Sequence, residues 1–259
     1  MINYNRRNKG LQNILSVLIF VLYVITNNAI AETYKFVGTT FTHILEQDSS
    51  GINKGIGAEL ATKIMTNIGH DIEIEIYPWK RAQMMVESGL ADVLIGPYKT
   101  SKREVFFNFN SYHFYQDYMM FYSRHDNEFT WNGDLSALNH LKIGLMAGWA
   151  YGDKFDNYKN KLSIVILHSF NSCFGMLLKN RIDLCALNQR NAEKYLSTNK
   201  HKFRQVKTPI SSVKGYYGFS KKLELHDLRI EFDRELKKLI DNNEVSQMNK
   251  RYGLYYVDE

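Results

Sequence analysis

The residue whose type and position best suit binding chemistry is Arg103, which follows a short apolar run. This run, Ala91–Ile95, comes directly after a glycine that ends a helix and is typical of a buried parallel strand. Gly96–Lys102 is then expected to be the loop at the carboxyl end of that strand, where open α/β sheets bind ligands. A guanidinium there offers a planar fork of donors that matches a carboxylate. The alternative is an arginine that caps the next helix or pairs with an acid at the surface.

Aromatic side chains are expected along the same edge of the sheet. Five of them follow predicted strands: Phe41, Trp79, Tyr98, Trp149 and Tyr151. Each alone is typical of core packing, but together they would hold a small ligand between flat faces. Gly148 is expected at the beginning of a helix, where free backbone N–H groups suit an anionic group.

Motifs of other chemistries are missing from the sequence. There is no Gly-x-Ser-x-Gly and no His-Glu-x-x-His, and the 8 histidines form no pair at metal-ligand spacing. The glycines of Lys54–Leu60 resemble the start of a dinucleotide loop, but leucine stands where the third glycine belongs. We therefore expect no metal, no cofactor and no catalytic residues.

The N-terminus has the three regions of a secretory signal peptide. Three basic residues at positions 6–9 precede an apolar run, Ile14–Ile25, and Ala29 and Ala31 supply the small residues of a cleavage site. The run is short for a membrane span, although an uncleaved anchor is the alternative. We expect cleavage after Ala31 and a periplasmic chain of 228 residues, which is 259 minus 31.

The charge of the mature chain is modest. Removing the three basic residues of the leader from a formal net charge of +6 leaves +3. Lysines and arginines are spread along the chain, so nucleic acid is not expected as a partner. A hydrophobic content of 44% with only 3 prolines indicates a folded chain.

The elements that position these residues alternate between strand and helix. Apolar residues at four-residue spacing predict a helix over Gly57–Ile68, and alternation with glutamates predicts a strand over Ile72–Ile76. Further strands are expected at Tyr34–Thr39, Tyr118–Tyr122, Lys142–Met146, Ile164–Leu167, Leu184–Leu187 and Tyr216–Ser220, and helices at Ser172–Lys179, Asn191–Leu196, Leu225–Ile240 and Val245–Tyr252. This alternation predicts a mostly parallel α/β architecture in two compact lobes.

The chain has two cysteines, Cys173 and Cys185. They fall near the start of a predicted helix and in the strand that follows it. An oxidising compartment permits a disulfide between them, but spacing alone leaves two buried free thiols as the alternative.

Several short motifs in a fixed order complete the sequence. They are Gly55–Leu60, Gly89–Asp92, Thr100–Arg103 followed by Phe106–Phe109, Asp134–Leu135 followed by Ile143–Leu145 and Gly148, and Asn180–Asp183. Their order and spacing resemble those of the bacterial extracellular solute-binding proteins of the amino-acid-binding type, family 3. The resemblance covers essentially the whole mature chain.

This resemblance implies a type II periplasmic-binding-protein fold. In that fold, two α/β lobes close on a ligand around a hinge of two crossing strands. The crossings would fall near Tyr112–Asp117 and Ser211–Gly215. Lobe 1 would comprise residues 32–114 and 214–259, and lobe 2 residues 115–213.

The resemblance also implies a set of ligand contacts. Arg103 would hold the carboxylate, and Phe41 and Trp79 would form aromatic walls. The other contacts expected are Gly96, Tyr98, Thr100, Gly148, Trp149 and Asn188. Asn188 stands where the family has an aspartate that binds the ligand's amine, and an amide cannot neutralise an ammonium. The expected ligands therefore include carboxylates without a free amine and modified or polar relatives of amino acids.

Taken together, these features predict a monomeric, non-enzymatic periplasmic protein. It would capture a small polar carboxylate, an amino acid or a relative of one, for uptake by a membrane ABC permease. Three alternatives stay open: a ligand-sensing subunit for a membrane receptor, a secreted dehydratase-like enzyme on the same fold, and a scaffold that needs no ligand. Arg81 is either a second cation of the cleft or a solvated residue.

Overall fold

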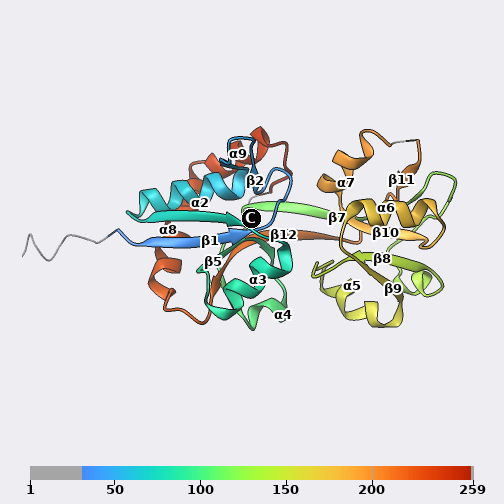
Figure 1. The fold of residues 1–259 in the computed structure, drawn as a ribbon, viewed down its shortest axis with the longest axis horizontal. Coiled ribbons are helices and arrows are strands. Elements are labelled where there is room, and N and C mark those ends of the chain that lie inside the picture. The colour runs from blue at the N-terminus through green and yellow to red at the C-terminus, as the bar shows by residue number, and fades with distance from the viewer. Residues whose placement is uncertain (1–30, 200, 258–259) are drawn as a thin grey trace, which may run out of the picture.

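The computed structural model describes residues 31–199 and 201–257 of the 259-residue chain. The predicted signal peptide, apart from Ala31, lies outside the described residues. Within the described part of the chain, no helix is long and apolar enough to cross a membrane. The elements gather into two lobes, which are joined by two long strands, β7 (Tyr115–Arg124) and β12 (Ser211–Ser220) (Figure 1).

These two strands, called the hinge strands below, pair antiparallel where they pass between the lobes. Met119 lies opposite Ser211 at one end of this pairing, and Tyr115 lies opposite Gly215 at the other. They belong to one continuous sheet with the strand order β4-β1-β5-β12-β7-β10-β8-β9. The two-lobed α/β arrangement with crossing strands that the sequence predicts is therefore present.

Lobe 1 holds the N-terminal elements and the C-terminal helices. β1 is parallel to both β4 and β5, and hinge strand β12 runs antiparallel to β5. The elements are β1 (Thr33–Gly38), β2 (Glu46–Gln47), β3 (Asn53–Lys54), α2 (Ile56–Asn67), β4 (Asp71–Ile76), α3 (Trp79–Ser88), β5 (Val93–Tyr98), α4 (Ser101–Glu104), β6 (Phe107–Phe109), α8 (His226–Asp241) and α9 (Glu244–Arg251). The four-residue apolar spacing in α2 buries Leu60 and Ile64 as expected.

Lobe 2 is built on three parallel strands, β10, β8 and β9, next to hinge strand β7. Its elements are η1 (Leu135–Leu138), β8 (Lys142–Met146), α5 (Asp153–Tyr158), η2 (Lys159–Lys161), β9 (Ser163–Leu167), α6 (Phe170–Leu178), β10 (Leu184–Asn188), α7 (Gln189–Leu196) and β11 (Phe203–Gln205). β10 runs antiparallel to β7, so the sheet of lobe 2 continues directly from the hinge.

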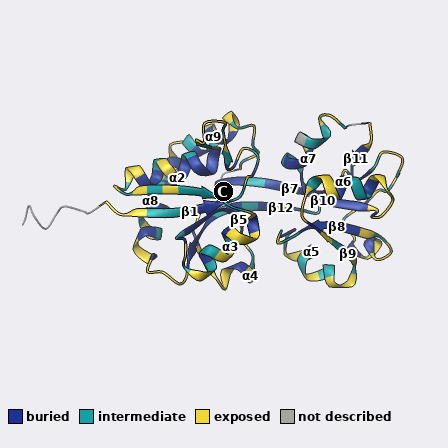
Figure 2. Cartoon of the chain, in the orientation of Figure 1, coloured by how far each residue is buried: buried dark blue, intermediate teal, exposed yellow. Residues whose placement is uncertain are grey.

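The buried residues concentrate on the strands, while exposed residues cover the outer faces of the helices (Figure 2). Aromatic rings fill the core of lobe 1 near the hinge. Tyr217 of β12 stacks on Phe114 with a centroid distance of 4.5 Å, and its hydroxyl donates to the carbonyl of Gly57 at 2.8 Å. This packing ties a hinge strand to α2, so the base of the hinge is fixed to lobe 1.

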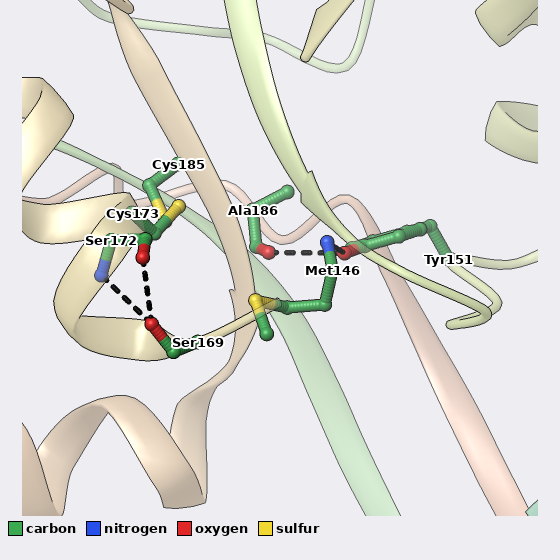
Figure 3. The surroundings of a disulfide bond; sticks show 7 residues. All are labelled: Met146, Tyr151, Ser169, Ser172, Cys173, Cys185 and Ala186. Atoms are coloured by element: carbon green, nitrogen blue, oxygen red, sulfur yellow. Dashed lines mark hydrogen bonds between the residues drawn. A yellow bond between two sulfur atoms is a disulfide. The ribbon is translucent and has the colours of Figure 1, made fainter. Parts of the chain in front are cut away.

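A disulfide joins Cys173 of α6 to Cys185 of β10 (Figure 3). The two Cα atoms are 6.0 Å apart, a usual separation for a disulfide. Ser169 caps α6 by accepting a hydrogen bond from the Ser172 N–H at 3.1 Å, which places Cys173 in the first turn. Of the two alternatives that the spacing left open, the structure contains the disulfide.

Two local predictions about the predicted ligand edge are wrong. The strand at residues 91–95 does not end before Gly96, because β5 pairs with β12 as far as Tyr98. Gly148 does not begin a helix, because Gly148 and Gly152 both have positive φ angles and α5 starts only at Asp153. The N–H groups of a helix start are therefore not available at Gly148.

Candidate functional site

Arg103 lies in α4, directly after the carboxyl end of β5. Thr100 caps this short helix, because its hydroxyl accepts a hydrogen bond from the Arg103 N–H at 3.3 Å. The Arg103 side chain points inward, and the residue is only 6% exposed. Nη1 donates to the Tyr98 carbonyl at 2.8 Å, and Nη2 donates across to the Gly148 carbonyl of lobe 2 at 3.1 Å. The guanidinium thus lies where the lobes meet, so the alternative of a surface arginine is wrong.

The charge of Arg103 is compensated only in part. Its guanidinium carbon lies 5.2 Å from the centroid of the Trp79 ring, and two carbonyl oxygens accept its hydrogen bonds. Among residues 31–199 and 201–257, no carboxylate forms an ion pair with it. Burial lowers the pKa of Arg103 below its ordinary value, yet an arginine remains protonated at any physiological pH. A buried cation without a charged partner favours the approach of an anion.

Aromatic rings from both lobes surround this guanidinium. The ring of Phe41 in lobe 1 packs against two tryptophans. Its centroid lies 6.0 Å from that of Trp79 and 5.6 Å from that of Trp149 in lobe 2. Trp79 Nε1 donates to the Gly148 carbonyl at 3.2 Å, the same oxygen that Arg103 uses. The rings leave a cavity of about 10 Å³, room for about one water molecule. Its lining consists of Phe41, Trp79, Gly96, Tyr98, Arg103, Trp149 and Ala150.

A much larger groove of about 630 Å³ opens beside this cavity. It runs between α3 and α4 of lobe 1 and β8, β9 and α5 of lobe 2, and Arg103 lines both spaces. Thr100, Gly148 and Trp149 also line the groove, together with an apolar strip formed by Leu145, Ile164 and Ile166. This volume lies within the range of small-molecule sites.

Asn188 ends β10 and caps α7. Its Oδ1 accepts from the Asn191 N–H at 3.1 Å, and its Nδ2 donates to the Tyr98 hydroxyl at 3.2 Å. Asn188 therefore lies behind Tyr98 and lines neither the cavity nor the groove. All nine residues expected as ligand contacts are thus near one another, but Asn188 reaches the others only through Tyr98.

Two further residues singled out in the sequence do not line the small cavity at Arg103. Tyr151 borders the larger groove, but its hydroxyl is held in the core of lobe 2, where it accepts from the Met146 N–H at 2.7 Å and donates to the Ala186 carbonyl at 3.3 Å (Figure 3). Arg81 is exposed, and its guanidinium carbon lies 4.7 Å from the centroid of the Tyr77 ring. It is therefore a solvated residue and not a second cation of the cleft.

The sequence reasoning missed an ion pair next to this cluster, between Asp117 of hinge strand β7 and Arg190 of α7. Arg190 Nε donates to Asp117 Oδ1 at 3.1 Å, and Nη2 donates to Oδ2 at 2.7 Å. The Tyr98 hydroxyl donates to the same Oδ2 at 2.7 Å. Both side chains are buried, with 8% of Arg190 and 3% of Asp117 exposed.

The charge of Asp117 shifts the pKa values of the two groups that donate to it, Arg190 and Tyr98. Burial by itself works to lower the pKa of Arg190, but the charge and hydrogen bonds of Asp117 outweigh it and raise the pKa above its ordinary value. Burial, followed by the charge of Asp117, raises the pKa of the Tyr98 hydroxyl. Tyr98 therefore stays protonated and acts as a donor to the carboxylate.

A model of the bacterial extracellular solute-binding proteins, family 3, matches residues 39–255. The chain belongs to this family. No curated protein matches the chain at a significant level. The two-lobed, type II fold that the sequence predicts is confirmed by similarity to solved structures of such proteins.

Three of these solved structures show the extent of the similarity. A putative L-cystine ABC transporter protein from Listeria monocytogenes is 17% identical, with a TM-score of 0.70 over 86% of this chain and 96% of that one. A histidine kinase sensor domain with similarity to periplasmic binding proteins is 18% identical, with a TM-score of 0.74 over 87% and 98%. An ancestral arginine-binding protein bound to arginine is 18% identical, with a TM-score of 0.70 over 85% and 97%. At these identities the similarity shows the fold alone.

In this solute-binding protein, the cluster around Arg103 combines one buried cation, aromatic rings from both lobes and backbone carbonyl groups, and the guanidinium is held by hydrogen bonds inside the protein. The described residues contain no group of three or more His, Cys, Asp or Glu side chains that could hold a metal ion.

Proposed function

We propose that this protein captures a small carboxylate ligand between its two lobes in the periplasm and passes it to a membrane ABC permease. The observation that carries the proposal is the buried Arg103 guanidinium, which has no carboxylate partner within the described residues and borders a groove of about 630 Å³. Two of the similar structures are named for L-cystine and arginine, ligands that carry a carboxylate.

The contacts within the site suggest how a ligand is held. A carboxylate in the groove would accept hydrogen bonds from Arg103 in place of the Gly148 carbonyl. Trp149, which lines the groove, and Trp79, whose ring lies next to Arg103, would flank its body. In this proposal the protein is a monomer, with lobe 1 formed by residues 32–114 and 214–259 and lobe 2 by residues 115–213. Gly96 and Thr100 would contact the ligand from lobe 1. The ligand drives closure only by binding the closed form more tightly than the open form.

The test is a binding screen on the mature chain, residues 32–259. Thermal shift would be measured against amino acids, N-acylated amino acids, hydroxy acids, oxo acids and dicarboxylates, because a specific ligand raises the unfolding temperature. Titration calorimetry would then compare the wild type with Arg103→Ala and with Arg81→Ala, which removes an exposed arginine. Arg103→Ala is expected to weaken binding by about 2–5 kcal/mol. A loss below tenfold, or an equal loss in Arg81→Ala, would rule out the anchoring role.

A sensing role is the second candidate, because the histidine kinase sensor domain shares this fold over 87% of the chain. Uptake of the identified ligand, measured with and without the gene, distinguishes the two: transport requires that uptake falls when the gene is deleted. The dehydratase alternative needs a free acid in the cleft. Two acids line the groove beside Arg103: Asp156 has its oxygens engaged by the Tyr151 N–H and by Lys159, and Asp153 is exposed. Among the described residues the groove thus offers no buried free acid, which argues against that alternative.

A further inference from the structure

The surroundings of the Arg190 guanidinium are those of a receptor for a cation. The Asp117 carboxylate binds it with two hydrogen bonds, and the rings of Phe41 and Tyr115 lie 5.4 Å and 5.7 Å from its central carbon. Its Nη1 donates to the carbonyl of Thr42. A bidentate carboxylate, aromatic faces and a carbonyl acceptor are the groups that recognise a free guanidinium or ammonium ligand. Here the chain's own side chain occupies the receptor.

This cation receptor adjoins the Arg103 cluster, and two residues belong to both. Phe41 contacts Arg190 and also lines the cavity beside Arg103. Tyr98 donates its hydroxyl to Asp117, while its carbonyl accepts from Arg103. The anion-seeking half at Arg103 and the cation-seeking half at Asp117 are therefore joined by Tyr98 and Phe41. Asp117 and Arg190 themselves line a separate groove of about 660 Å³.

The charges of the two halves decide what kind of ligand they accept. Arg190 and Asp117 neutralise each other, and Asn188 is an uncharged amide, so Arg103 is left as the uncompensated charge of the cluster. A ligand with an ammonium or guanidinium group would have to displace Arg190 from two charge-assisted hydrogen bonds. It would also leave a second buried cation without a partner.

We propose that Arg190 is a specificity-determining residue: it fills an internal cation site and thereby restricts the ligand to carboxylates that bring no cationic group. This inference rests on the proposed function and names the ligand class of the same cleft. The Arg190–Thr42 hydrogen bond also links α7 of lobe 2 to the loop after β1 of lobe 1, so the internal cation contributes to the contact between the lobes.

The first experiment replaces the internal cation by an external one. Arg190→Ala leaves the Asp117 carboxylate buried without its partner, and guanidinium ion at millimolar concentration should bind in its place. The unfolding temperature of Arg190→Ala is expected to rise by about 2 °C or more in guanidinium chloride over an equal concentration of sodium chloride. The wild type and the double variant Asp117→Asn/Arg190→Ala are expected to show no such difference.

A matched control is available at the surface of lobe 2. Arg124 binds Asp126 through Nε at 2.8 Å and Nη2 at 2.7 Å, the same two-bond geometry, but the Asp126 side chain is 69% exposed. Arg124→Ala is expected to show no preference for guanidinium over sodium. A folded Arg190→Ala that also shows no preference would overturn the inference.

The second experiment uses the wild type and does not depend on how the variant folds. Matched series of 2-hydroxy acids, 2-oxo acids and amino acids with the same side chain would be titrated by calorimetry. We expect the acids without an amine to bind at least tenfold more tightly than the matching amino acid. Equal or tighter binding of the amino acid overturns the inference and leaves the Arg103 anchor intact. If no carboxylate binds at all, the proposed function fails instead, while the guanidinium experiment still decides whether Arg190 fills a cation site.

Discussion

Arg190 and Asp117 are joined by two hydrogen bonds, of 3.1 Å and 2.7 Å, although 73 residues separate them in sequence. One member lies on a hinge strand and the other in the first turn of α7, at the carboxyl end of β10. The pair therefore fixes α7 against the hinge from inside the protein. Both side chains are almost fully buried at the base of a groove of about 660 Å³, so the charge that is left when the other is removed is poorly solvated.

The first prediction concerns the stability of this pair. Asp117→Asn keeps the size of the side chain but leaves the Arg190 guanidinium buried without a counter-charge, which should lower the free energy of unfolding by about 3–5 kcal/mol. Urea denaturation measures the change. Asp126→Asn, at the exposed pair with Arg124, should cost less than about 1 kcal/mol. If Asp117→Asn were as mild as Asp126→Asn, the pair would not be buried in solution.

A second prediction concerns the close approach of the hinge strands. A Cβ atom added at Gly215 would lie 1.7 Å from Cε1 of the Tyr115 ring, which packs flat over that glycine. The Tyr115 hydroxyl donates to the Gly96 carbonyl at 2.7 Å, so the ring cannot move without breaking this bond. Gly215→Ala should therefore destabilise the protein by at least about 1–3 kcal/mol.

The matched variant for this test is Gly175→Ala in α6. A Cβ at Gly175 would meet nothing within 4 Å, and alanine is the better helix former. Gly175→Ala should raise the free energy of unfolding by about 0.5–1 kcal/mol. If the hinge strands pack as described, urea denaturation will show a lower free energy of unfolding for Gly215→Ala and a higher one for Gly175→Ala. Changes of the same sign in both variants would contradict this packing.

A third prediction concerns the disulfide of lobe 2. Cys173 and Cys185 are 12 residues apart, and closing a loop of this length in the unfolded chain stabilises the folded state by about 3 kcal/mol. The double variant Cys173→Ala/Cys185→Ala should lose about this much in urea denaturation. Reductant should destabilise the wild type and leave the double variant unchanged. A wild type that is insensitive to reductant would show that the two thiols are not joined.

The elements of the fold could largely be predicted from the sequence, because their apolar periodicity is local information. The spacing of Leu60 and Ile64 predicted α2, and alternation around Ile74 predicted β4. The end of β5 could not be predicted this way. Its continuation through Gly96 to Tyr98 depends on pairing with β12, more than 100 residues further along the chain, and this pairing overrides the local turn signal.

The site was predictable in part for a similar reason. Arg103 could be located because it directly follows a recognisable strand, and the structure places it between the lobes. Asp117 gave a signal that was not used: it is an acid in phase with the buried Tyr115 and Met119 of an alternating strand, which indicates an inward charge in need of a partner. The identity of that partner, Arg190, is set by the packing of α7 on the hinge, and the sequence alone contains no measure of it.

The last prediction is a pH dependence from Asp92, the half-buried residue before β5. Burial raises the pKa of its carboxyl above the ordinary 3.8, and the hydrogen bond from the Lys35 N–H at 2.7 Å opposes this only in part. Since the folded chain then binds the proton more tightly than the unfolded chain, Asp92 makes the protein less stable as the pH rises through the raised pKa. Asp92→Asn does not titrate and keeps an oxygen that can accept from Lys35.

The stability of Asp92→Asn relative to the wild type should therefore increase when the pH is raised from about 3 to about 7. Asp134→Asn should behave in the opposite way. The side-chain and backbone hydrogen bonds from Ser136 lower the pKa of Asp134, so its carboxylate stabilises the folded state above 3.8 and this contribution is lost as the pH falls. Urea denaturation of both variants and the wild type at the two pH values measures these differences. If the Asp92→Asn difference stayed constant or fell with rising pH, burial would not be raising the pKa of that carboxyl.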